Sequence, residues 1–138
     1  MNIKLSNVQA AVFNVLDEAT FRTFDEEKEI KVGDSFSEEI PLPFIFLGEI
    51  NQSRLDTKTI LGKEVTLTIH VASNFRGKEE CFEIVEGIEE ILNRELNVEG
   101  ARVIDNRVES INVQEIKANF IEGRVVFKIQ MHEEQEEY

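Results

Sequence analysis

The most restrictive feature of the sequence is the strict alternation of apolar and polar side chains in residues 63–73, KEVTLTIHVAS. Val65, Leu67, Ile69 and Val71 occupy every second position of this segment. Because successive side chains of a strand point to opposite faces of a sheet, a period of two predicts a strand with one buried face and one exposed face. The chain must therefore contain a sheet, and an apolar layer must cover one face of it.

Three further segments predict strands. Residues 43–50, PFIFLGEI, have apolar side chains at successive positions, which is typical of burial on both faces. We expect this strand to pair antiparallel with the alternating strand, and the polar residues 51–62, here called the arm, to join them. Residues 101–116 and 120–132 are expected to form a second hairpin with its turn near 118–119. The irregular pattern of 101–116 indicates a bulge or bend.

Two amphipathic segments, residues 5–19 and residues 77–96, carry apolar stripes at three- and four-residue spacing and are predicted to be helices. Residues 20–43 are acidic, contain two prolines, and are expected to be a long surface loop with at most a short strand near 29–32. The predicted fold class is α+β, with two helices packed on one face of a mainly antiparallel sheet of about four to five strands. We expect one domain over residues 1–132.

Composition and charge exclude several classes of protein. The net charge of −13 argues against nucleic-acid binding, which needs a basic footprint. No apolar run approaches the length of a membrane span, and the N-terminus lacks the apolar core of a signal peptide, so we expect synthesis in a cytoplasm. Cys81 is the single cysteine and is expected to be a buried apolar residue. Residues 133–138, EEQEEY, are expected to form an acidic C-terminal tail.

No catalytic or ligand-binding motif is complete. Gly62-Lys63-Glu64 resembles the end of a phosphate-binding loop, but that loop needs Ser or Thr where Glu64 stands. His70 and His132 lack the nearby thiols or spaced carboxylates of a metal site, and we expect both to be ordinary surface residues. The sequence therefore predicts a protein that is not an enzyme and that holds no metal and no cofactor.

The order of motifs from residue 43 onward is more specific than any one of them. A Pro-aromatic strand ends in Gly-Glu at residues 48–49, Thr57-Lys58-Thr59 follow in the arm, and a glycine precedes the alternating strand. An aromatic–Arg–Gly turn, residues 75–77, then leads into the second helix. In this order the chain resembles the tail completion proteins of long-tailed bacteriophages, also called tail-to-head joining or tail terminator proteins. The resemblance covers most of the chain, and the acidic segment near residues 20–40 and the acidic tail depart from the pattern.

The resemblance implies a structural virion protein that catalyses no reaction. Members of that family form a ring, typically of six subunits, at the head-proximal end of the tail tube. The ring terminates tail growth and joins the tail to the head connector, and DNA passes through its lumen without specific binding. The implied partners are further copies of the chain, the tail tube protein and the head connector protein. The implied location is the virion, with assembly in the host cytoplasm. Two alternatives remain open, another small phage head–tail adaptor and a cytoplasmic α+β binding or regulatory module.

Candidate contact residues lie in three places. Arg54, Asp56, Lys58 and Thr59 lie in the arm, where alternating charges could pair across the repeated heterologous interface that closes a ring. The alternative for the arm is a solvated mobile hairpin. Phe36, an aromatic residue among acids, is the second candidate, because an exposed aromatic side chain is unusual unless a partner covers it. Arg76 is the third candidate, with either a carboxylate of the second helix or a neighbouring subunit as its contact.

Overall fold

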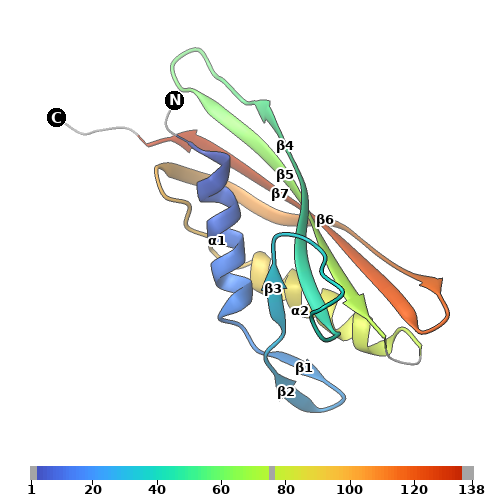
Figure 1. Ribbon diagram of the computed structural model, residues 1–138. Coiled ribbons are helices and arrows are strands. Elements are labelled where there is room, and N and C mark those ends of the chain that lie inside the picture. Colours follow the sequence, from blue (N-terminus) through green and yellow to red (C-terminus); the bar gives the residue numbers. More distant parts are fainter. Residues whose placement is uncertain (1–2, 75–76, 135–138) are drawn as a thin grey trace.

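The computed structural model describes residues 3–74 and 77–134, which form two helices and seven strands in two sheets (Figure 1). In chain order the elements are α1 (Leu5–Asp17), β1 (Phe21–Thr23), β2 (Glu26–Lys28), β3 (Lys31–Gly33), β4 (Phe44–Arg54), β5 (Gly62–Ser73), α2 (Glu79–Leu92), β6 (Ala101–Lys117) and β7 (Phe120–Glu133).

The larger sheet has five strands in the order β3-β4-β5-β7-β6. All neighbouring pairs are antiparallel except β3 and β4, which run parallel. The predicted antiparallel pairing of the segments around 43–50 and 63–73 is confirmed, and so is the second hairpin, whose turn contains Asn119 with a positive φ. The bulge predicted in residues 101–116 is also present, because the β6–β7 register shifts three times.

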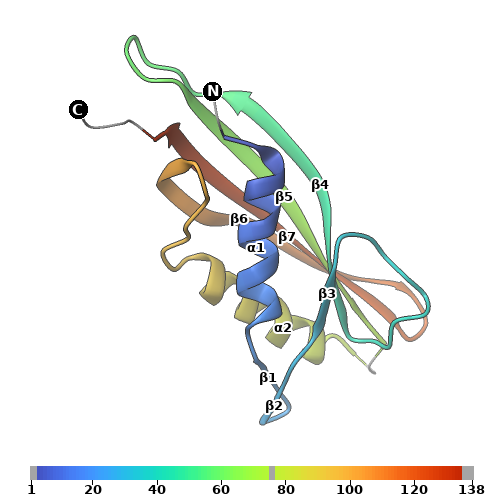
Figure 2. The same ribbon diagram turned by 60° about the vertical axis from the view of Figure 1, so that its left-hand side comes forward.

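Both helices lie on the same side of the larger sheet (Figures 1 and 2). The apolar side chains of β5 that alternate in the sequence are buried under these helices, together with Phe127 and Ile129 of β7. Helix α2 approaches β7 closely at Gly123, where an added Cβ would lie 2.7 Å from both Cys81 Sγ and Val85 Cγ1. Glycine at this position therefore sets the spacing between α2 and the sheet.

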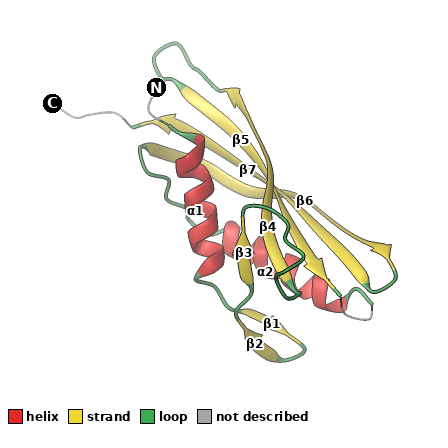
Figure 3. Ribbon diagram, viewed as in Figure 1, coloured by secondary structure: helices red, strands yellow, loops and turns green. Residues whose placement is uncertain are grey.

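Strands β1 and β2 form a separate two-stranded sheet beside α2 (Figure 3). The ring of Phe21 packs where Gly87 of α2 has no side chain, since a Cβ there would lie 2.9 Å from the ring. A buried carboxylate also holds this region together. Glu80 is 3% exposed, accepts a 2.7 Å hydrogen bond from Ser73 Oγ, and lies 3.5 Å from Lys28 Nζ. One side chain of α2 thus contacts the end of β5 and the end of β2.

The predicted fold class is wrong. The chain does not form simply two helices on a mainly antiparallel sheet. It is mostly β, with a five-stranded mixed sheet and a second, two-stranded sheet. The error lies in residues 20–43, for which the sequence predicts a loop with at most a short strand near 29–32. Strand β3 overlaps that short strand, whereas β1 and β2 are not predicted. Strands of three residues are too short to show a period in the sequence. The features that fix these short strands in the fold are single buried side chains, namely those of Phe21, Ile30 and Val32.

The helices are shorter than the apolar stripes predicted. Helix α1 ends at Asp17 and α2 ends at Leu92. The stripe of α2 continues to Leu96 because the chain after the helix still buries Leu96 and Val98 against the core. Neither helix in the described part of the chain is long and apolar enough to cross a membrane. Of the predicted acidic tail, residues 135–138 lie outside the described residues.

Candidate assembly surfaces

The arm lies at the end of the sheet that β4 and β5 share, next to the start of the described chain (Figure 1). Its base is fixed by Asp56. One carboxylate oxygen, Oδ1, accepts a 3.0 Å hydrogen bond from the backbone N–H of Gly62, and the other, Oδ2, accepts a 2.8 Å bond from Arg54 Nε. The Gly62 N–H, with a further contribution from Arg54, lowers the pKa of Asp56 below its ordinary value of 3.8.

A tight turn forms the tip of the arm. Thr57 donates its backbone N–H to the Ile60 carbonyl at 2.8 Å, and its Oγ1 accepts the Ile60 N–H at 3.0 Å. Lys58 and Thr59 are exposed at this tip. Of the four arm residues predicted as contacts, the structure pairs Arg54 with Asp56 inside the arm, at 2.6 Å, and leaves Lys58 with no ion pair among the described residues. Contact of these residues with another subunit stays a prediction.

The lowered pKa of Asp56 makes the base of the arm sensitive to acid. A depressed carboxyl pKa contributes stability that is present above the unfolded value, and this contribution is lost as pH falls through the folded value. We expect the proton chemical shift of the Gly62 amide to titrate with a midpoint below 3.8, the ordinary aspartate value. NMR titration of the wild type and of Asp56→Asn checks this, because the amide variant removes the titrating group. A midpoint above 3.8 would contradict the hydrogen bond.

Phe36 lies on the opposite face of the sheet from the helices and belongs to an aromatic cluster. Its ring meets Phe46 edge-on at 5.7 Å and Phe120 edge-on at 6.2 Å between centroids. Phe46 in turn stacks on His70 at 4.7 Å. Phe36 is still 43% exposed, so these rings cover only part of it. Its contact with a partner stays a prediction. The third candidate, Arg76, lies outside the described residues.

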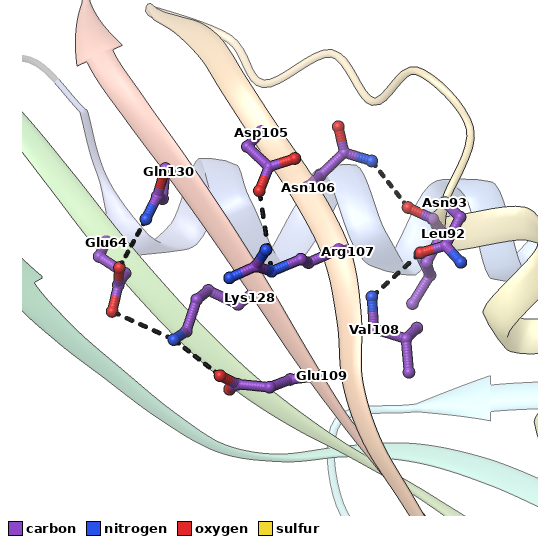
Figure 4. Close-up of polar contacts among 10 residues, drawn as sticks. All are labelled: Glu64, Leu92, Asn93, Asp105, Asn106, Arg107, Val108, Glu109, Lys128 and Gln130. Carbon is purple, nitrogen blue, oxygen red and sulfur yellow. Dashed lines mark hydrogen bonds and ion pairs between the residues drawn. The ribbon is translucent and has the colours of Figure 1, made fainter.

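The uncovered face of the sheet carries a network of charges (Figure 4). Lys128 Nζ lies 2.8 Å from Glu109 Oε1 and 3.6 Å from Glu64 Oε1, and Gln130 donates a 2.9 Å hydrogen bond to Glu64. The Gln130 hydrogen bond, with a smaller effect of Lys128, lowers the pKa of Glu64. Glu109, and Glu64 to a smaller extent, raises the pKa of Lys128. Each of these polar groups therefore has its ion-pair or hydrogen-bond partner within the subunit.

Sequence reasoning missed this network and the attachment of β6 to α2. Glu64 and Gln130 are 66 residues apart and meet only because of the β5–β7 register, which no local pattern reveals. Asn106 of β6 donates a 2.7 Å hydrogen bond to the carbonyl of Leu92 at the end of α2 (Figure 4). It donates a second bond, of 2.6 Å, to the carbonyl of Arg94. An asparagine among charged residues in a long strand is the one sequence signal that could have drawn attention to this site.

No arrangement suited to a metal ion occurs in residues 3–74 and 77–134, where no three His, Cys, Asp or Glu side chains are grouped for it. The Cys81 thiol is buried, and burial, with a smaller effect of the Glu80 charge, raises its pKa to about 12. His70 stacks on a phenylalanine and lies 3.5 Å from Glu122.

Comparison with known proteins identifies the family. The family model described as tail completion protein gp17 matches residues 8–131. Among solved structures, the fold is similar to a chain of the virion of a native gene transfer agent particle, with a TM-score of 0.74 and 18% sequence identity over 91% of this chain and 94% of that chain. No curated protein sequence matches the chain. The chain belongs to the tail completion protein gp17 family, as its motifs indicated, and its role in completing the phage tail is structural.

Proposed function

We propose that the chain forms a ring of six subunits at the head-proximal end of the tail tube, where it stops tube growth and presents the surface that the head connector binds. The observation that carries the proposal is the family match over residues 8–131, which extends from α1 almost to the end of β7. The match favours tail completion over another head–tail adaptor and over a cytoplasmic binding or regulatory module.

The arrangement of the sheet supports a ring. Closed rings need two different surfaces on each subunit, since every interface joins the front of one copy to the back of the next. The larger sheet has an open edge on each side. The one strand beside β6 in the described chain is β7, and the outer edge of β6 is otherwise bonded at Val108 to Asn93 at the end of α2. Strand β3 pairs with only residues 44–46 of β4, so the rest of that edge has no strand neighbour in the described chain. Unpaired edges of this kind are available for contact with another chain.

The charge of the chain supports a lumen through which DNA moves. A net charge of −13 on each subunit repels phosphates, so a ring of such subunits would let DNA pass without holding it. The proposed ring carries out no reaction. Burial raises the pKa of the Cys81 thiol to about 12, which leaves little thiolate at neutral pH and argues against this thiol as a nucleophile.

Native mass spectrometry across a range of protein concentrations tests the ring. We expect a closed assembly at six times 15.9 kDa, with few smaller species at high concentration, because a closed ring is more stable than its open intermediates. A spectrum recorded at raised ionic strength shows how far charge pairs hold it together. A stable dimer at all concentrations would contradict a head-to-tail ring.

A further inference from the structure

A wide groove of about 980 Å³ lies between the chain that follows α2, the start of β6 and the end of β7. The lining residues that determine its charge and its apolar surface are Glu95, Glu99, Arg102, Ile104, Glu133 and Glu134. Four of these are carboxylates, and none of the four makes an ion pair with any residue that the structure describes. Ile104, on the edge strand, is 50% exposed within this acidic surface. The groove therefore suits an occupant with both a positive charge and apolar surface.

The arm tip has this chemistry. Lys58 stands at the tip without an ion-pair partner among the described residues, while the only other cation of the arm, Arg54, is held by Asp56. Leu61 is 39% exposed beside the tip. The turn between Thr57 and Ile60 fixes the backbone at Lys58, so the backbone there has little conformational freedom to lose on binding.

We propose that the arm of one subunit lies in the groove of the next subunit, with Lys58 among the four groove carboxylates and the apolar side chains of the arm against Ile104. This inference rests on the proposed ring and names the contact that closes it. The match is one of charge: one unpaired cation on the arm faces an excess of unpaired carboxylates on the groove.

The geometry favours the arm of a different copy over the arm of the same chain. Ile60 of the same chain already borders the groove, yet the space remains open. The hydrogen bonds of Asp56 to Gly62 and Arg54 fix the course of the arm at its base and keep its tip from folding over into that space. With the groove of each subunit beside its own arm, entry of the preceding arm would place successive arms next to one another around the ring.

Disulfide trapping between two separate single-site variants tests the contact. Thr59→Cys, which places a thiol at the exposed arm tip and keeps Lys58, is mixed with isotope-labelled Asn97→Cys, which places a thiol in the groove lining. The mixture is oxidised, and its mass is measured without reductant. The native Cys81 does not interfere because it is buried. We expect a disulfide-linked heterodimer at about tenfold or more the yield of a control pair, since docking raises the local thiol concentration. Using two chains excludes an intrachain bond.

The control pair is Ala118→Cys with the same Asn97→Cys partner, because Ala118 is exposed in the turn after β6, away from the groove, and its replacement leaves the charge unchanged. Equal yields for the two pairs, or no heterodimer at any concentration, would overturn the groove assignment. Trapping detects transient contacts, so either outcome is decisive whether or not rings are abundant. The mass of the wild-type assembly separately decides the proposed ring. A ring with no heterodimer above the control yield would leave the proposed function standing and the groove contact refuted.

Discussion

Phe127→Ala is expected to lower the free energy of unfolding by about 3–5 kcal/mol, because the ring is deeply buried and its removal leaves a cavity that the sheet and helices cannot fill. Phe127 is fully buried on β7, the strand between β5 and β6. Its neighbours across the two strand pairs are Leu67 and Val108. Urea denaturation followed by circular dichroism measures the loss.

The matched control is Val126→Ala, one residue earlier on the same strand. Val126 points to the face that the helices do not cover and is only partly buried. We expect this change to cost about 1 kcal/mol or less, since less apolar surface returns to water. Similar losses for the two variants would contradict the assignment of the two faces of β7.

The second large effect is expected at the buried carboxylate of α2. Glu80→Ala should destabilise the fold by about 2–3 kcal/mol, because it removes the 2.7 Å acceptor of the buried Ser73 hydroxyl and leaves a small cavity. It also removes the contact with Lys28, through which α2 is joined to the small sheet. Glu80→Gln keeps an acceptor for Ser73 and should fall between the wild type and the alanine variant.

Glu86→Ala is the control for charge. Glu86 is exposed on the same helix, so the variant relieves the same unit of negative charge without touching a buried group. Its stability should stay within about 0.5 kcal/mol of the wild type. If Glu80→Ala unfolded at the same urea concentration as Glu86→Ala, the buried carboxylate would have no role in stability.

The parts of the fold that the sequence predicted correctly are those in which a regular apolar pattern extends over many residues. Alternation over residues 64–71 located β5 and its buried face, and the apolar stripes located both helices. The prediction for residues 20–43 misses β1 and β2, because these strands have only three residues each, and it misses the parallel pairing of β3 with β4. That pairing involves only three residues of each strand and the buried side chain of Val32. The acidic residues on either side of β3 hide this single apolar position in the sequence pattern.

The two candidate surfaces differ in how far a local sequence pattern indicates them. The local charges of the arm predict contact with another subunit, and that contact stays a prediction. The structure adds that Arg54 and Asp56 pair with each other, which leaves Lys58 as the cation at the tip. The groove was missed because its lining comes from three segments that the fold brings together, near residues 95–104, at the end of β7 and at Ile60 of the arm. No spacing within the sequence indicates that Glu99 and Glu134 share a surface.

The position of β7 has a consequence for synthesis. This strand comes after all the other elements, yet it lies between β5 and β6 and pairs with both. A nascent chain that has not yet released residues 120–133 from the ribosome has no partner for β6 and only half of the neighbours of β5. The five-stranded sheet, and with it the paired edge strand β6, can therefore form only after translation has passed β7.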